Sequence, residues 1–234
     1  GNAASTSQSN NTVTLNDKTA PTLSSVGIAS NNSTTTLAKV ADVVTLTFTA
    51  SETIATPVVT FQSGSAAITD NSITYASSGN VWTAAYTANA SDTTGSVTYS
   101  IAFSDSAGNA GTAVTSGSGS VTFDKTAPTL SSVGIASNNS TTTLAKVADV
   151  VTLTFTASET IATPVVTFQS GSAAITDNSI TYASSGNVWT AAYTANASDT
   201  TGSVTYSIAF SDSAGNAGTA VTSGGGSVTF DKTA

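Results

Sequence analysis

The sequence predicts an all-β protein with two β-sandwich domains in tandem. Its 234 residues contain two nearly identical copies: Asp-Lys-Thr-Ala-Pro begins at Asp17 and again 107 residues later at Asp124, and Asp-Lys-Thr-Ala returns after another 107 residues at Asp231. Within each copy apolar residues alternate with polar ones, which is the period of a half-buried strand. No segment keeps a helical period with capping residues, so we expect little helix.

The repeat defines the domain organisation. Residues 17–123 and 124–230 differ only at Ser118, where the second copy has Gly225, and an interval of this length suits one small domain. Gly1-Asn2-Ala3 corresponds to residues 108–110, so residues 1–16 are expected to be the tail strand of a preceding repeat or a leader. Residues 231–234 begin a further linker. Pro21 and Pro128 make these linkers short and stiff.

The alternating segments give about seven strands in each copy, the number of an immunoglobulin-like sandwich. In the first copy we expect strands at 23–28, 44–50, 58–61, 68–75, 82–88 and 97–103, and a broken last strand over 114–123. The Gly-Ser tract at 116–120 lies inside that last strand and predicts a bulge or kink there.

Composition excludes several classes of function. The chain has no His, Cys, Met or Arg, so disulfides, thiol nucleophiles and imidazole metal sites are excluded. With 13 acidic and 5 basic residues it has a net charge of −8, which disfavours nucleic acid and attracts cations. No apolar run is long enough to span a membrane, and residues 1–16 lack the pattern of a signal peptide.

Oxygen-bearing side chains are predicted to gather at the ends of the domains. If the strands alternate in direction, the linker, the loop with Glu52 and the loop 105–111 face the preceding domain, whereas Asp42 and Asp92 face the following one. Side chains of both copies are then expected to converge at the central junction. The expected metal ligands are Asp17, Glu52, Asp105 and Asn109, their equivalents Asp124, Glu159, Asp212 and Asn216, and Asp42 and Asp92.

Calcium is the cofactor that these groups favour, because it takes roughly six to eight oxygen ligands that several loops can supply. The alternative is that the segment from Asp105 to Asn109 is only a tight turn, in which Asp and Asn cap their own backbone and Gly108 takes a positive φ. No contiguous calcium loop with alternating acids is present. Both interpretations stay open at this point.

Several segments that together cover most of each repeat resemble one known family. They are Asp17–Leu23, Leu37–Val40, Val43–Glu52, Trp82–Ala84 and Phe103–Asn109. Their combination is similar to the bacterial immunoglobulin-like tandem repeats of giant secreted surface adhesins. The resemblance implies a non-catalytic extender that projects a ligand-binding tip from the cell and is often stiffened by calcium between repeats.

Other functions remain as alternatives. Trp82 and Trp189 could form a sugar-binding platform, although their alternating spacing favours a place in the core. Residues 1–16 could complete a neighbouring chain in a fibre, and Lys39, the one Lys of its copy outside the linker, could form a cross-link with an Asn. A hydrolase triad is excluded because the chain has no His, and no phosphate-binding loop is present, so we expect no enzyme.

The leading hypothesis from the sequence is therefore a stalk repeat of an extracellular or cell-surface bacterial protein. Its expected partners are neighbouring repeats of the same chain, with self-association through residues 1–16 as a further route. The adhesive ligand is expected to bind at a distal tip outside this chain. Nucleic acid binding and direct membrane insertion are not expected.

Overall fold

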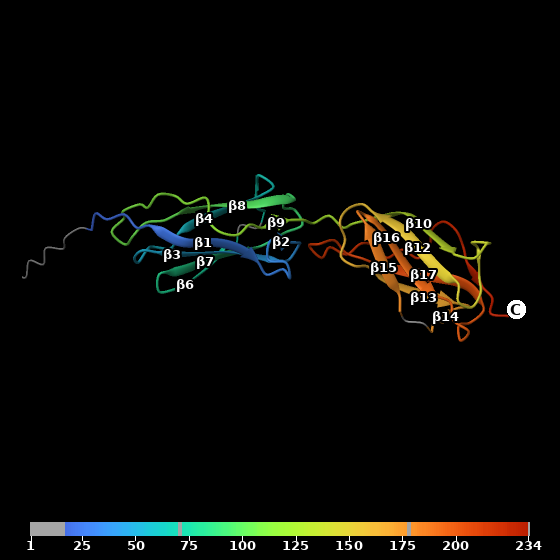
Figure 1. Cartoon of the computed structure of the whole chain (residues 1–234). Coiled ribbons are helices and arrows are strands. Elements are labelled where there is room, and N and C mark those ends of the chain that lie inside the picture. Colours follow the sequence, from blue (N-terminus) through green and yellow to red (C-terminus); the bar gives the residue numbers. More distant parts are fainter. Residues whose placement is uncertain (1–16, 70–71, 177–178, 234) are drawn as a thin grey trace, which may run out of the picture.

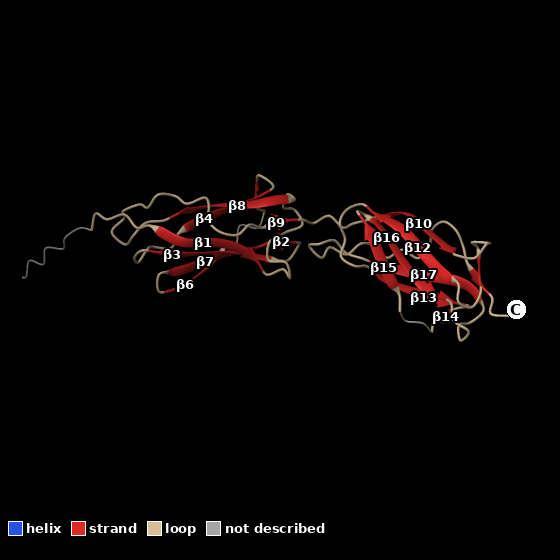
Figure 2. Ribbon diagram, in the orientation of Figure 1, coloured by secondary structure: helices blue, strands red, loops and turns tan. Residues whose placement is uncertain are grey.

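The computed structural model describes residues 17–69, 72–176 and 179–233. The expected leader strand in residues 1–16 lies outside this part. Two β-sandwiches lie end to end, and the linker that starts at Asp124 joins them (Figure 1). The described residues contain strands, turns and loops and no helix (Figure 2). The all-β prediction is therefore confirmed.

The first domain has two sheets that pack face to face. One has the strand order β1-β3-β7-β6 and the other β2-β9-β8-β4-β5. The strands are β1 (Leu23–Ser30), β2 (Leu37–Ala38), β3 (Val43–Ala50), β4 (Val58–Ser63), β5 (Ala66–Ala67), β6 (Thr74–Ser78), β7 (Val81–Thr87), β8 (Gly95–Ala102) and β9 (Thr122–Phe123). Neighbouring strands are antiparallel except β2 and β9, which are parallel.

The second domain repeats this arrangement, with sheets of order β10-β12-β16-β15 and β11-β18-β17-β13-β14. Its strands are β10 (Leu130–Ser137), β11 (Leu144–Ala145), β12 (Val150–Ala157), β13 (Val165–Ser170), β14 (Ala173–Ala174), β15 (Thr181–Ser185), β16 (Val188–Thr194), β17 (Gly202–Ala209) and β18 (Thr229–Phe230). The four-stranded sheet faces a sheet whose central strands are β18, β17 and β13, which is the immunoglobulin-like arrangement.

Each domain has nine strands in the described residues rather than seven, because two additional strands of two residues each border the second sheet. In the first domain, Gly64 has a φ of 55° and turns the chain so that β5 folds back on β4. The predicted last strand is interrupted as expected. Val114 bridges to Ile101, the Gly-Ser tract crosses to β1 where Ser118 bridges to Gly27, and only β9 completes the sheet.

The core follows the sequence alternation. Leu46 and Phe48 on β3 are fully buried while Thr47 between them is exposed. Trp82 is half-buried and packs against this core, and Trp189 does the same in the second domain. The core position predicted for both tryptophans is confirmed. No helix in the described residues is long and apolar enough to cross a membrane.

Candidate cation sites and the domain junction

Hydrogen bonds between the linker and two loops bring three acidic residues of the first domain together. Thr22 donates its backbone N–H to Ser51 Oγ at 3.0 Å, and Ser51 donates its backbone N–H to the Thr22 carbonyl at 2.9 Å. Three residues further on, Ile54 forms an antiparallel bridge with Asp105. The linker, the loop after β3 and the loop after β8 therefore meet at one end of the sandwich.

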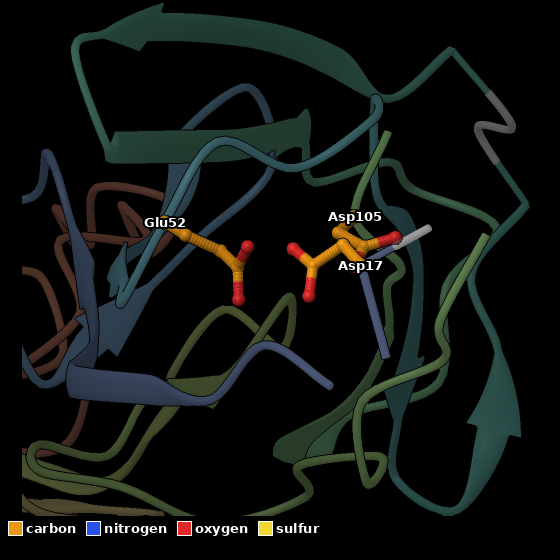
Figure 3. Close-up of side chains that lie close together, drawn as sticks. All are labelled: Asp17, Glu52 and Asp105. Atoms are coloured by element: carbon orange, nitrogen blue, oxygen red, sulfur yellow. The ribbon is translucent and has the colours of Figure 1, made fainter. Parts of the chain in front are cut away.

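Asp17, Glu52 and Asp105 form the first acidic cluster. One carboxylate oxygen of each lies within 4.8 Å of those of the other two, and Figure 3 shows the Glu52 carboxylate directed toward the two aspartates. Asp105 is buried, Glu52 is half-buried and Asp17 is exposed. The cluster is thus open to solvent on the side of the linker, where a hydrated ion has access.

Asn109 holds Asp105 in place. Its backbone N–H donates to Asp105 Oδ1 at 2.8 Å, and its side-chain Nδ2 donates to Asp105 Oδ2 at 2.7 Å and to the Asp17 carbonyl at 2.9 Å. The hydrogen bond from the Asn109 side chain lowers the pKa of Asp105, which keeps that carboxylate ionised. Asn109 therefore positions Asp105 and the linker through its amide nitrogen, and its expected role as an oxygen ligand stays a prediction.

The tight turn that stood as the alternative is also present. Gly108 has a φ of 92°, and its backbone N–H donates to the Asp105 carbonyl at 3.3 Å. The turn and the acidic cluster are compatible, because the backbone of Asp105 closes the turn while its side chain faces Asp17 and Glu52.

Asp124, Glu159 and Asp212 form the equivalent cluster of the second domain, again with one oxygen of each within 4.8 Å of the others. Burial, and then the charges of Asp124 and Asp212, raise the pKa of Glu159 above its ordinary value. A raised pKa in the folded protein means that ionisation of Glu159 costs stability as the pH rises through that pKa. A bound cation would remove this repulsion. Asn216 positions Asp212 as Asn109 positions Asp105, with contacts of 2.8 and 2.7 Å.

Asp124 connects the two domains. Its backbone N–H donates to the Ala38 carbonyl of the first domain at 2.8 Å, and its carbonyl accepts from Asn216 Nδ2 of the second domain at 3.0 Å. Its carboxylate belongs to the second acidic cluster. One residue is therefore held by both domains and by any ion in the cluster.

Lys125 fixes the direction in which the linker leaves the first domain. Its Nζ donates to the Asp92 carbonyl at 2.6 Å and to the Ala90 carbonyl at 2.9 Å. In the last linker Lys232 makes the equivalent contact, at 3.0 Å, with the Asp199 carbonyl. Lys232 makes this contact with no third domain beside it in the structure, so the domain that precedes the linker is enough to form it.

The carboxylates of Asp42 and Asp92 do not join either cluster, and this corrects the expectation that they converge with Asp124, Glu159, Asp212 and Asn216 at the central junction. Asp42 Oδ2 accepts from Asn32 Nδ2 at 2.7 Å and from the Lys39 backbone N–H at 2.8 Å. Asp92 Oδ1 accepts from the backbone N–H and the hydroxyl of Thr69 at 2.7 and 2.8 Å. Both aspartates cap loops of the first domain near the junction, and the clusters in the described residues are groups of three.

Two residues of the junction were not predicted. Lys125 belongs to the repeated linker motif, so the repetition itself was a signal for it. Asn32 lies in a polar turn without a distinguishing pattern, yet its Nδ2 donates across the junction to the Ala214 carbonyl at 2.9 Å. Lys39, considered for a cross-link with an Asn, has its Nζ 3.5 Å from Asp42 Oδ1 and a side chain that is 37% exposed.

The clusters offer hard oxygen ligands. Three carboxylates supply up to six oxygens, and water can complete the shell on the exposed side, which suits calcium better than a soft metal. The chain contains no His or Cys to add nitrogen or sulfur ligands. Chemically, the arrangement is therefore suited to holding a divalent cation between the linker and the loops that it meets.

Comparison with protein-family models and with curated proteins finds no match. Among solved structures, the chain is similar to an I-band fragment of titin, with 13% identity and a TM-score of 0.48 over 92% of this chain. It covers 66% of that fragment, slightly less than two thirds. It is also similar to titin domains in complex with telethonin (16% identity, 93% of this chain, 98% of that chain, TM-score 0.30) and to tandem Ig repeats of Dlar (12%, 92%, 98%, TM-score 0.26).

Proposed function

We propose that this chain is a non-catalytic extender segment of a bacterial surface adhesin, and that calcium stiffens the junctions between its repeats. The fold itself is a pair of tandem immunoglobulin-like modules. The location at the cell surface and the binding of calcium are what we propose beyond it. The observation that carries the proposal is the position of Asp124. This residue is hydrogen-bonded to both domains and contributes its carboxylate to a cluster of three acids.

Stiffening follows from where the ion would bind. The linker contributes Asp124, and the second domain contributes Glu159 and Asp212, so an ion between them ties the linker to the second domain. The same linker is already tied to the first domain through the Asp124 N–H and the Lys125 Nζ. A cation would therefore add a second tie between the linker and the second domain, beside the hydrogen bond that Asn216 donates to the Asp124 carbonyl.

A role as a spacer accounts for the repetition. Two copies with one difference in 107 residues duplicate a module without adding a new functional group. In this proposal the adhesive ligand is bound at a tip beyond these repeats, and the chain lies at the cell surface. The acidic surface disfavours nucleic acid as a partner, and neighbouring repeats are the partners that each domain meets.

Small-angle scattering and calorimetry in calcium and in chelator test the proposal. We expect calcium to raise the melting temperature of the chain and to narrow its distribution of maximum dimensions. Asp124→Asn should weaken both effects. Asp231→Asn changes the same motif where no further acidic cluster is present in the described residues, and it is the matched control. Unchanged dimensions and melting temperature on chelation would refute the calcium part.

A further inference from the structure

The two copies allow one domain to serve as the control for the other. The two domains have the same sequence at the end of the sandwich formed by the loops after β1 and β2 and their equivalents. Differences in burial between equivalent residues there therefore arise from the neighbouring domain. We call this face the distal face. It consists of Asn32, Lys39 and Asp42 in the first domain and of Asn139, Lys146 and Asp149 in the second.

The distal face of the first domain is covered by the loop 212–218 of the second domain. Asn32 donates one N–H of its amide to Asp42 and the other to the Ala214 carbonyl, at 2.7 and 2.9 Å. Ala214 is 4% exposed, whereas its equivalent Ala107 is exposed. In Figure 1 this loop extends from the second sandwich toward the end of the first, next to β2.

The tip of the loop lies within van der Waals range of Lys39. A Cβ added to Gly215 would lie 3.4 Å from Lys39 Cε, whereas a Cβ at the equivalent Gly108 would meet no atom within 4 Å. Asn32 and Asp42 are correspondingly buried, while Asn139 and Asp149 are half-buried. The contact thus joins a polar face to an Ala-Gly loop tip through one hydrogen bond and close packing.

The distal face of the second domain has the same structure without this covering. Asn139 Nδ2 donates to Asp149 Oδ2 at 2.8 Å, and Asn139 Oδ1 accepts from the Thr141 N–H at 3.1 Å. The Lys146 backbone N–H also donates to Asp149, at 2.9 Å. Among the described residues, the second amide N–H of Asn139 has no acceptor, and it corresponds to the group that binds Ala214 in the first domain. The face is therefore preorganised, which lowers the cost of binding.

We propose that the distal face formed by Asn139, Lys146 and Asp149 is a docking surface for the 105–111 loop of a further copy of this repeat, joined through residues 231–234. This docking proposal rests on the proposed function in one respect, which is that the protein contains an array of repeats. The contact uses an amide, a carbonyl and van der Waals packing, and none of these groups belongs to the acidic clusters. The docking contact itself therefore needs no cation, and a cation in the acidic cluster would stiffen the linker beside it.

Thiol cross-linking tests the docking surface, because the chain has no Cys. A three-repeat chain is made by continuing after Ala234 with a copy of residues 128–230. It carries Lys146→Cys and a Cys at the counterpart of Gly215 in the added copy. Lys39→Cys with Gly215→Cys in the two-repeat chain is the reference. We expect a short bis-thiol reagent to cross-link both pairs at similar rates in calcium and in chelator.

The control places the second Cys at the counterpart of Gly186 in the added copy. Gly186 is also a turn glycine with a positive φ, 58°, and a Cβ there would meet no atom within 4 Å, so the docking contact is not involved. Cross-linking of the Lys146→Cys pair no faster than this control would overturn the proposal.

Asn139→Ala provides a second readout, since losing one hydrogen bond of about 1 kcal/mol should slow cross-linking about fivefold. An undiminished rate would contradict the role of Asn139. Cross-linking that occurs only in calcium would overturn cation-independent docking while leaving the proposed calcium stiffening intact. Equal cross-linking in both conditions, combined with scattering that is insensitive to calcium, would leave the docking surface and remove the calcium proposal.

Discussion

Replacing Glu159 by Gln should change the stability of the second domain in opposite directions with and without calcium. In chelator the substitution removes a negative charge whose carboxylate lies within 4.8 Å of those of Asp124 and Asp212. With calcium bound, it removes a ligand. The raised pKa of Glu159, caused by burial and then by its two acidic neighbours, points to the same repulsion.

The magnitude follows from Coulomb's law. At 4.8 Å two unit charges repel by about 1 kcal/mol in a medium with the dielectric constant of water. Two neighbours give about 2 kcal/mol, and salt screening at a partly exposed site reduces this to about 1 kcal/mol. For a domain of this size, that gain raises the melting temperature by about 4 °C in chelator. Calcium at one hundred times its dissociation constant stabilises the native protein by about 2.7 kcal/mol, and the variant should lose most of this.

The assay must report on the second domain alone. Trp82→Phe leaves Trp189 as the one tryptophan of the chain, so thermal unfolding followed by tryptophan fluorescence monitors that domain. Asp231→Asn in the same background is the control for loss of a linker charge. A variant that melts at or below the parent temperature in chelator would refute the electrostatic reasoning, and an unchanged calcium shift would refute the assignment of Glu159 as a ligand.

Three further predictions follow from the core, the linker and the first cluster. Phe48→Ala should destabilise the first domain by about 3–5 kcal/mol because Phe48 is fully buried, whereas Thr47→Ala on the exposed face should change its stability by about 0.5 kcal/mol or less. Urea unfolding with a separate transition for each domain measures both effects, and equal effects would contradict the core assignment. Lys125→Met removes the hydrogen bonds to the Ala90 and Asp92 carbonyls and should lower the NMR backbone order parameters of residues 124–127, with Lys18→Met as the control. Unchanged order parameters would show that the Lys125 contacts do not fix the linker. Asn109→Ala removes the hydrogen bond that lowers the pKa of Asp105. A carboxyl whose pKa is lower in the folded than in the unfolded protein stabilises the fold above its unfolded pKa, and this stability is lost as the pH falls through its folded pKa. The variant should therefore be less stable at pH 7, and its stability should depend less on pH in the acid range, as measured by urea unfolding at several pH values. A parallel loss at every pH would contradict this last account.

Much of the fold was accessible from the sequence because strand formation depends on a local pattern. The alternation of Leu46 and Phe48 with threonines specifies one buried and one exposed face, and the structure has both residues fully buried. The two-residue strands β2 and β5 were not predicted, since two residues carry no measurable period. They form because neighbouring strands supply the hydrogen-bonding edge.

The candidate site divides in the same way. The sequence by itself determined that oxygen ligands are the only kind available and that Asp17, Glu52 and Asp105 come from segments at one end of the sandwich, because strand parity fixes the end at which each loop lies. Tertiary structure decided which of these groups meet. It brought together three carboxylates, turned the amide nitrogen of Asn109 toward Asp105 and engaged Asp42 and Asp92 with donors of their own domain.

The junction was decided almost entirely by tertiary structure. The sequence determined that a linker beginning at Asp124 repeats and that Pro128 fixes one of its φ angles. Only the packed domains show that the Asp124 backbone is shared between them and that Asn32 reaches the Ala214 carbonyl from a position 182 residues earlier in the chain. A pattern along the chain reports which face a side chain presents, whereas the partner across a junction depends on the relative placement of two folded units.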